Sequence, residues 1–172
     1  MWAWLRRLLS TKEPVQVRVW QPRLVLSEAC LDGVARSLRR TIAACHEGIV
    51  YLLGHTDGET TVATTAIQPA AHTTHGSFNV SSVAMARVVR AAADHGLQVV
   101  AQVHSHPGEA YHSEGDVAGA RIKYPGYVSI VLPDYGRQLP SLEGAAVYMC
   151  NPDRVFHQLG DGAIRTAPGY LQ

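Results

Sequence analysis

The strongest constraint on the fold is a repeated change of hydrophobic period along the chain. From Ser27 to Cys45, apolar residues recur every three or four positions, which predicts a helix with one buried face and Ser27 as its N-cap. Residues 48–54 are short and almost entirely apolar, which is typical of a central strand buried on both faces. A second helical period covers 80–95 and is followed by a strand-like run over 97–103. This alternation predicts an α/β (α+β) fold, with a mixed β-sheet flanked by helices.

Shorter patterns complete the expected order of elements. Residues 15–19 alternate between valine and polar residues, as in an edge strand, and a strand over 60–67 would form a hairpin with the central one. Residues 68–78 contain a proline, a glycine and two histidines, so we expect a loop there. A helix start is predicted near Ser113. Further strands are predicted over 24–26, 127–132, 145–150 and 154–159.

Length and composition predict one folded domain. The 172 residues are 47% apolar and 17% charged, which excludes an intrinsically disordered chain. We assign residues 15–160 to that domain, residues 1–14 to an amphipathic arm and residues 161–172 to a loose tail. The formal charge of +1 argues against nucleic acid as a partner, because phosphate binding needs a basic excess or a basic stripe.

The cysteines and the apolar runs bear on the cellular compartment. The three cysteines form no CxxC pair, so neither a disulfide framework nor a thiolate metal site is indicated. No apolar run approaches the roughly 20 residues that span a bilayer. Arg6 and Arg7 interrupt the N-terminal run, which therefore does not resemble a signal peptide. We expect a cytoplasmic protein whose arm docks on its own domain or on a partner rather than on a membrane.

The residues most indicative of chemistry are two histidines at the end of a predicted strand. His104 and His106 are two positions apart, and the two-residue period of a strand directs both imidazoles to one side of the sheet. Pro107 and Gly108 then turn the chain, and Asp116 follows on a segment that could return to the histidines. Two imidazole nitrogens and one carboxylate oxygen are a ligand set of catalytic zinc sites.

Ser113 and Asp116 also have a second interpretation, which is compatible with the first. The pattern Ser-x-x-Asp is typical of a helix N-cap followed by an acidic residue in the first turn, so both residues could simply begin a helix. A helix start that holds its carboxylate rigidly is also a suitable way to present a metal ligand. Glu47 could likewise be a solvated glutamate at the end of the first helix.

Together these residues resemble the signature of the JAMM, or MPN-plus, zinc metallopeptidases, in their stand-alone prokaryotic form. That signature combines an upstream glutamate, His-Ser/Thr-His-Pro and Ser-x-x-Asp. Here Glu47, residues 104–107 and residues 113–116 occur in the same order, and the expected elements agree over 27–150. The resemblance implies a JAB/MPN-like sandwich of the cytidine-deaminase-like type. One departure is the spacer before Ser113, which has six residues where the commonest family pattern has seven.

The resemblance also implies a reaction and a role for each residue. His104, His106 and Asp116 would bind Zn²⁺, Glu47 would act as general base and then protonate the leaving amine, and Ser113 would donate to the oxyanion. No organic cofactor is implied. The implied reaction is hydrolysis of the amide or isopeptide bond after the C-terminus of a ubiquitin-like protein, in precursor processing or deconjugation.

The family resemblance suggests partners and leaves two alternatives open. The substrate tail is expected to bind by strand addition, at an exposed edge around 127–132 or at 68–78. Activating or conjugating enzymes of a bacterial ubiquitin-like pathway are expected further partners. The alternatives are release of a sulfur-carrier protein from its adduct, and a catalytically silent MPN-type scaffold, which would usually lack the metal ligands.

The other histidines carry weaker predictions. His112 is near enough to line the site, but we expect it to be exposed to solvent in its loop. His72 and His75 are assigned to the protein surface. Tyr111 could contact substrate or pack within the loop. The remaining histidines lie at or near the ends of elements, where a turn or a helix terminus explains them: His46, His55, His95 and His157.

Overall fold

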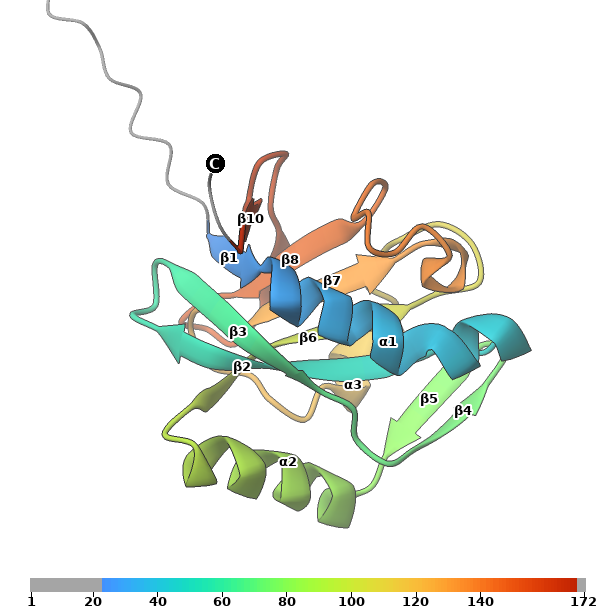
Figure 1. Ribbon diagram of the computed structural model, residues 1–172, viewed down its shortest axis with the longest axis horizontal. Coiled ribbons are helices and arrows are strands. Elements are labelled where there is room, and N and C mark those ends of the chain that lie inside the picture. The colour runs from blue at the N-terminus through green and yellow to red at the C-terminus, as the bar shows by residue number, and fades with distance from the viewer. Residues whose placement is uncertain (1–22, 170–172) are drawn as a thin grey trace, which may run out of the picture.

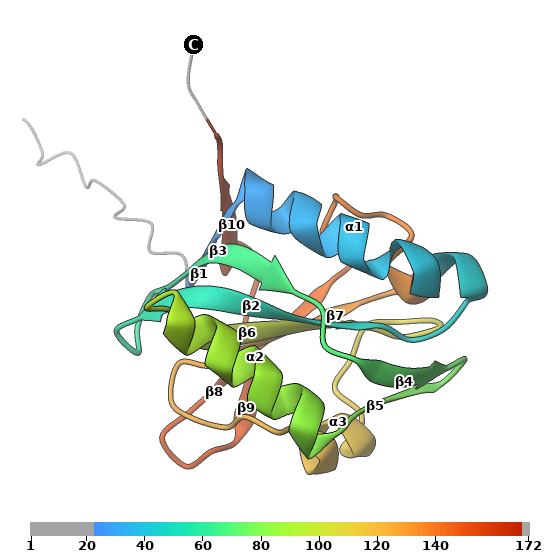
Figure 2. The ribbon, with the colours of Figure 1, turned by 60° about the horizontal axis from the view of Figure 1, so that its bottom comes forward.

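A mixed β-sheet lies between two helices in the computed structural model, which describes residues 23–169 (Figure 1). The helix α1 (Glu28–Ala44) covers one face of the sheet and α2 (Ser82–Asp94) the other (Figure 2). The eight strands have the order β10-β1-β3-β2-β6-β7-β8-β9. Their bounds are β1 Leu24–Ser27, β2 Ile49–Thr56, β3 Thr61–Ile67, β6 Gln98–Ser105, β7 Val128–Leu132, β8 Ala146–Cys150, β9 Phe156–Gln158 and β10 Ile164–Ala167. The predicted fold class is therefore confirmed.

Local hydrogen bonding explains where the two long helices begin. The Ser27 side chain accepts a hydrogen bond from the Cys30 backbone N–H at 3.1 Å, as predicted for the N-cap of α1. Ser81 caps α2 in the same way, so this helix begins after Val80 rather than at it. Both caps satisfy backbone donors that the first turn of a helix leaves without a partner.

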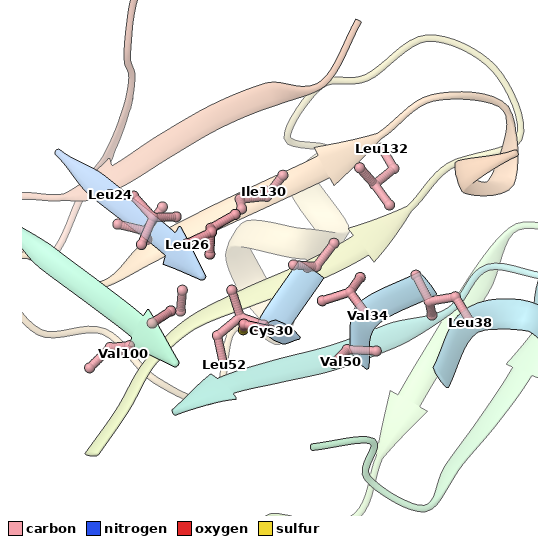
Figure 3. Close-up of a cluster of buried hydrophobic side chains, with 14 residues drawn as sticks. Leu24, Leu26, Cys30, Val34, Leu38, Val50, Leu52, Val100, Ile130 and Leu132 are labelled. Atoms are coloured by element: carbon pink, nitrogen blue, oxygen red, sulfur yellow. The ribbon is translucent and has the colours of Figure 1, made fainter. Parts of the chain in front are cut away.

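The strand β2 separates two hydrophobic clusters, because its side chains alternate between the faces of the sheet. Val50 and Leu52 belong to the cluster under α1, which Figure 3 shows, and Ile49, Tyr51 and Leu53 belong to the cluster under α2. All five residues are at most 3% exposed. Burying an apolar side chain of this size contributes about 1.5–3 kcal/mol. The core on both faces explains why the predicted central strand is almost wholly apolar.

Two sequence predictions about irregular segments are wrong. Residues 68–78 do not form a simple loop, because β4 (Ala71–Thr74) and β5 (Ser77–Val80) make a separate two-stranded hairpin. The predicted loose tail also contains a strand. β10 pairs in parallel with β1, with Leu24 opposite Ile164, and so extends the sheet at that end.

The expected exposed edge around 127–132 is also absent. β7 pairs with β6 on one side and β8 on the other, and all five of its residues are buried. Of the two segments predicted to bind a substrate tail, 127–132 is therefore excluded, and 68–78, which contains the β4–β5 hairpin, is left. The predicted arm at 1–14 and strand at 15–19 lie outside the described residues. Within residues 23–169, no helix is both long and apolar enough to cross a membrane.

The connection between β6 and β7 contains His106, Ser113 and Asp116. These strands are parallel neighbours, with Val103 opposite Ile130. A crossover must therefore return the chain from the end of β6 at Ser105 to the start of β7 at Val128. It contains the short helix α3 (Glu114–Gly119). The crossover brings residues 104–107 and residues 113–116 together at one end of the sheet.

Candidate metal centre

The three predicted metal ligands meet at the end of β6. His104 is wholly buried near the end of the strand, and His106 follows it, with its backbone N–H bonded to the Leu132 carbonyl at 2.9 Å. Asp116, on α3, places Oδ1 3.3 Å from His104 Nε2 and Oδ2 3.2 Å from His106 Nε2. The ligand atoms of the three residues lie within 4.8 Å of one another. The structure thus brings the predicted set together.

The position of Asp116 follows from the start of α3. The Ser113 hydroxyl accepts from the Asp116 backbone N–H at 3.1 Å, while the Ser113 backbone N–H donates to Asp116 Oδ2 at 2.8 Å. These bonds form a capping box with aspartate in its third position. The Ser113 hydroxyl also donates to Asp116 Oδ2 at 2.7 Å. The helix-start interpretation of Ser-x-x-Asp is therefore confirmed, and the same bonds hold the Asp116 carboxylate beside the two histidines.

Glu47 is buried between α1 and β2, at 7% exposure, rather than solvated at a helix end. The backbone N–H of the neighbouring Gly48 donates to the Ser105 hydroxyl at 3.0 Å. In return, the Ser105 backbone N–H donates to the Gly48 carbonyl oxygen at 3.1 Å. Ser105 stands between the two histidines, so these bonds fix Glu47 beside them. A Cβ at Gly48 would lie 2.5 Å from Leu38 Cδ2, which explains the glycine.

The four titratable groups shift one another's pKa values. Burial raises the pKa of Glu47, although the nearby His106 opposes the rise. Burial lowers the pKa of His104. Burial also acts to lower the pKa of His106, but Asp116 and Glu47 outweigh it and raise that pKa. For Asp116, burial acts upward, yet the two imidazoles and the Ser113 hydroxyl hold the pKa far below its usual range. The cluster therefore favours an ionised Asp116 and a neutral His104.

The residues fit a bound metal ion. Both ring nitrogens of His104 are buried and have no hydrogen-bond partner among the described residues, since the 3.3 Å approach to Asp116 lacks hydrogen-bond geometry. A buried polar atom without a partner costs folding free energy, which a metal bond would offset. Two imidazole nitrogens with one carboxylate oxygen suit a divalent transition metal and leave coordination positions open.

A cavity of about 840 Å³ opens onto this centre. Its lining includes all four residues of the β5 strand and small residues of α3, among them Gly115, Ala118 and Gly119. Glu47, His106 and Asp116 line the cavity together. Tyr111 stands at the opening, 54% exposed, with its ring edge-on to His106 at 5.1 Å between centroids. An extended chain could therefore reach the metal ligands between β5 and α3.

The contacts of His112 near the site are not predictable from the spacing of its neighbours in the sequence. The prediction that His112 is exposed to solvent is wrong: its ring stacks on Tyr148 and reaches the Ser129 hydroxyl. Burial lowers the pKa of His112 to about 4, so the ring is neutral at physiological pH. In the sequence, the polar Ser129 within an otherwise apolar strand is the feature that indicates a buried polar partner. His72 and His75 lie exposed on the hairpin, as assigned.

Comparisons with known proteins agree with this arrangement. Residues 27–145 match the family of prokaryotic homologues of the JAB domain. The chain is 30% identical over 129 residues to the probable metalloprotease y4jG of Sinorhizobium fredii, which covers 73% of this chain and 80% of that protein. A protein of Desulfitobacterium hafniense, known from its solution structure, is similar in fold. It has a TM-score of 0.61 and 15% identity, over 84% of this chain and 93% of that one.

Proposed function

Because the chain belongs to the family of prokaryotic JAB-domain proteins, we propose that it is a zinc-dependent peptidase that hydrolyses the amide or isopeptide bond after the tail of a ubiquitin-like protein. The observation that carries the proposal is the cluster of His104, His106 and Asp116, of which His106 and Asp116 line the cavity. The buried and unpartnered nitrogens of His104 support the metal. The family and the probable metalloprotease relative support the peptidase chemistry.

Glu47 is the residue suited to move protons in this reaction. His104, His106 and Asp116 would hold a Zn²⁺ ion, which when bound would supply Lewis acidity to the attacking water and the scissile carbonyl. Glu47 lines the same cavity, and burial raises its pKa towards the range in which a carboxylate both accepts and returns a proton. As general base it would take the proton of the attacking water. It would then deliver that proton to the leaving amine.

Ser113 is the residue suited to stabilise the developing oxyanion. Its hydroxyl lies beside Asp116 and lines the cavity. In the structure the hydroxyl donates to Asp116, so rotation about the Cβ–Oγ bond would be needed to aim its proton at substrate. A donor placed where negative charge develops typically contributes about 10²–10³-fold in rate.

The shape of the cavity favours an extended substrate tail. The β5 strand runs along one wall, and a peptide could add to its outer edge through backbone hydrogen bonds. Gly115, Ala118 and Gly119 also line the cavity, and their small side chains leave room for a substrate backbone. An extended tail between β5 and α3 would fit there. Processing of precursors and removal of conjugates both require such a tail.

The direct experiment incubates the purified protein with ubiquitin-like fusions and with a sulfur-carrier adduct, and follows cleavage by mass spectrometry. We expect cleavage after the ubiquitin-like tail, loss of cleavage after chelation and recovery with Zn²⁺. Glu47→Gln is the matched control, because it removes the base and leaves the three ligands. A protein that binds the fusions but cleaves none would be a scaffold. A protein without stoichiometric metal would contradict the peptidase function itself.

A further inference from the structure

His112 makes a set of contacts that the proposed reaction does not use. Its ring lies parallel to the Tyr148 ring, with centroids 4.1 Å apart and 3° between planes, and edge-on to Phe156 at 5.0 Å. The same ring stacks with His104 at 5.9 Å. The His112 backbone N–H donates to the Tyr148 hydroxyl at 3.2 Å. One loop residue is thus attached to β8 and β9 through both its ring and its backbone.

A buried chain of polar side chains ends on the same ring. The Tyr127 hydroxyl donates to Gln102 Oε1 at 3.3 Å, Gln102 Nε2 donates to the Ser129 hydroxyl at 3.2 Å, and Ser129 Oγ lies 2.8 Å from His112 Nε2. Because Ser129 accepts from Gln102, its own proton is available to His112. Tyr127, Gln102 and Ser129 are at most 5% exposed. Buried polar groups need hydrogen-bond partners, so this series of hydrogen bonds holds the His112 ring in one orientation.

The helix α3, which follows His112, has no buried residue that would pack it against the sheet. The helix α3 presents Ser113 and Asp116, yet none of its six residues is buried. A helix this short without an apolar face against the core is only marginally stable by itself. The loop that leads into it has only six residues after His106, so a fixed point at its end strongly restricts where α3 can begin.

We infer that His112 is a positioning residue, whose contacts with Ser129 and Tyr148 fix the start of α3 and so hold Ser113 and Asp116 opposite the histidines of β6. The effect on metal affinity rests on the proposed metal centre, whereas the effect on α3 does not. A ligand that is held in place before the ion arrives loses less conformational entropy on binding. His112 should therefore order α3 in the metal-free protein and strengthen metal binding.

Two measurements on the full chain test this inference. The first is backbone hydrogen exchange in the metal-free protein, and the second is Zn²⁺ affinity by competition with a chromophoric chelator. We expect His112→Ala to speed exchange over 113–119 while β2 keeps its protection, and to weaken Zn²⁺ binding about 10- to 100-fold, the range for residues that support metal ligands. His55→Ala, an exposed histidine at the far end of β2, is the control and should change neither.

Two further variants separate the ring from the hydrogen bond. His112→Gln keeps a polar group within reach of Ser129, and His112→Phe keeps the stacking on Tyr148. We expect each to recover part of the Zn²⁺ affinity that His112→Ala loses. Wild-type exchange and affinity in His112→Ala would overturn the inference, as would faster exchange throughout the sheet with unchanged affinity. If the wild-type protein binds no Zn²⁺ but His112→Ala frees 113–119, the proposed function fails and the anchoring role stands.

Discussion

The backbone N–H of Glu47 donates a hydrogen bond to the carbonyl oxygen of Thr74 at 2.8 Å, which joins the candidate base directly to the β4–β5 hairpin. The hairpin is also held from the opposite side of the site. The Tyr135 hydroxyl donates to the His75 carbonyl at 3.2 Å, and the Tyr135 backbone N–H donates to the His106 carbonyl at 2.7 Å. The β4–β5 hairpin, Glu47 and His106 are therefore parts of one hydrogen-bonded unit.

Glu47→Gln should separate metal binding from hydrolysis. Glutamine has the size of glutamate but cannot accept a proton at neutral pH, so we expect kcat to fall by about 10²–10⁴-fold. The zinc content should remain at the wild-type level, because the proposed ligands His104, His106 and Asp116 are unchanged. Metal analysis and a cleavage assay on the same preparation check this. Normal turnover in this variant would remove Glu47 from the mechanism.

His104→Ala and Asp116→Ala should lose the metal itself. Each removes one of three ligands, so we expect Zn²⁺ affinity to fall by more than the roughly 10- to 100-fold that supporting residues cost. Zinc is measured by elemental analysis after purification and by chelator competition. His55→Ala serves as the control, because this exposed histidine lies outside the cluster. Unchanged metal content in either ligand variant would refute that ligand assignment.

Zn²⁺ binding should weaken as the pH falls. A histidine binds a metal in its neutral form, and the pKa of His106 is raised above the ordinary value because Asp116 and Glu47 outweigh its burial. Proton competition should therefore begin above the usual histidine pKa of about 6.5. Calorimetry from about pH 8 to about pH 5.5 measures this. Glu47→Gln removes one cause of the raised pKa and should move the transition to lower pH. Affinity independent of pH would contradict this account.

Ser113 should contribute to both rate and stability. Ser113→Ala removes an N-cap, which costs about 1 kcal/mol, and the proposed oxyanion donor, which costs about 10²–10³-fold in kcat. Ser113→Thr keeps a hydroxyl and a cap, so it should restore most of the stability and part of the rate. Denaturant unfolding and steady-state kinetics measure the two effects separately. If the stability of Ser113→Ala falls as expected but kcat stays near the wild-type value, Ser113 has the capping role alone.

Gly54→Ala tests the packing of the central strand. A Cβ at Gly54 would lie 1.8 Å from the Val62 carbonyl oxygen on β3, next to the register shift between Leu53 and Gly54. Backbone must move to admit a methyl group there, so we expect the free energy of unfolding to fall by about 1–3 kcal/mol or more. Gly160→Ala, where a Cβ meets open space, is the control and should stay within about 0.5 kcal/mol. Equal effects would disprove the steric explanation.

Features with a local signal were predictable from the sequence. The α1 helix was predicted from its hydrophobic period and the cap at Ser27, and β2 from its apolar run, because each signal lies within the element itself. The two histidines and Ser-x-x-Asp were found because short spacings carry the chemistry. The hairpin was missed because Pro69 and Gly76 indicate a loop. In the structure, Gly76 instead forms half of a two-residue turn between Thr74 and Ser77.

Features that depend on distant partners could not be predicted in this way. β10 is a strand because Ile164 pairs with Leu24, and nothing within its four residues indicates that partner. The environment of His112 is set by Ser129 and Tyr148, which come from two other strands. Loop composition favours exposure of such a residue, whereas the sheet behind it decides the outcome.

The parallel pairing of β6 and β7 has a consequence for how such a protein can diversify. His104 lies in β6, His106 and Asp116 lie in the crossover that follows it, and β7 begins only at Val128. A residue gained or lost in that crossover changes the spacing between the ligands without shifting any strand pair. The spacer of six residues between His106 and Ser113 lies within this crossover. The length of one connection can therefore alter the spacing of the candidate ligands while the sheet keeps its register.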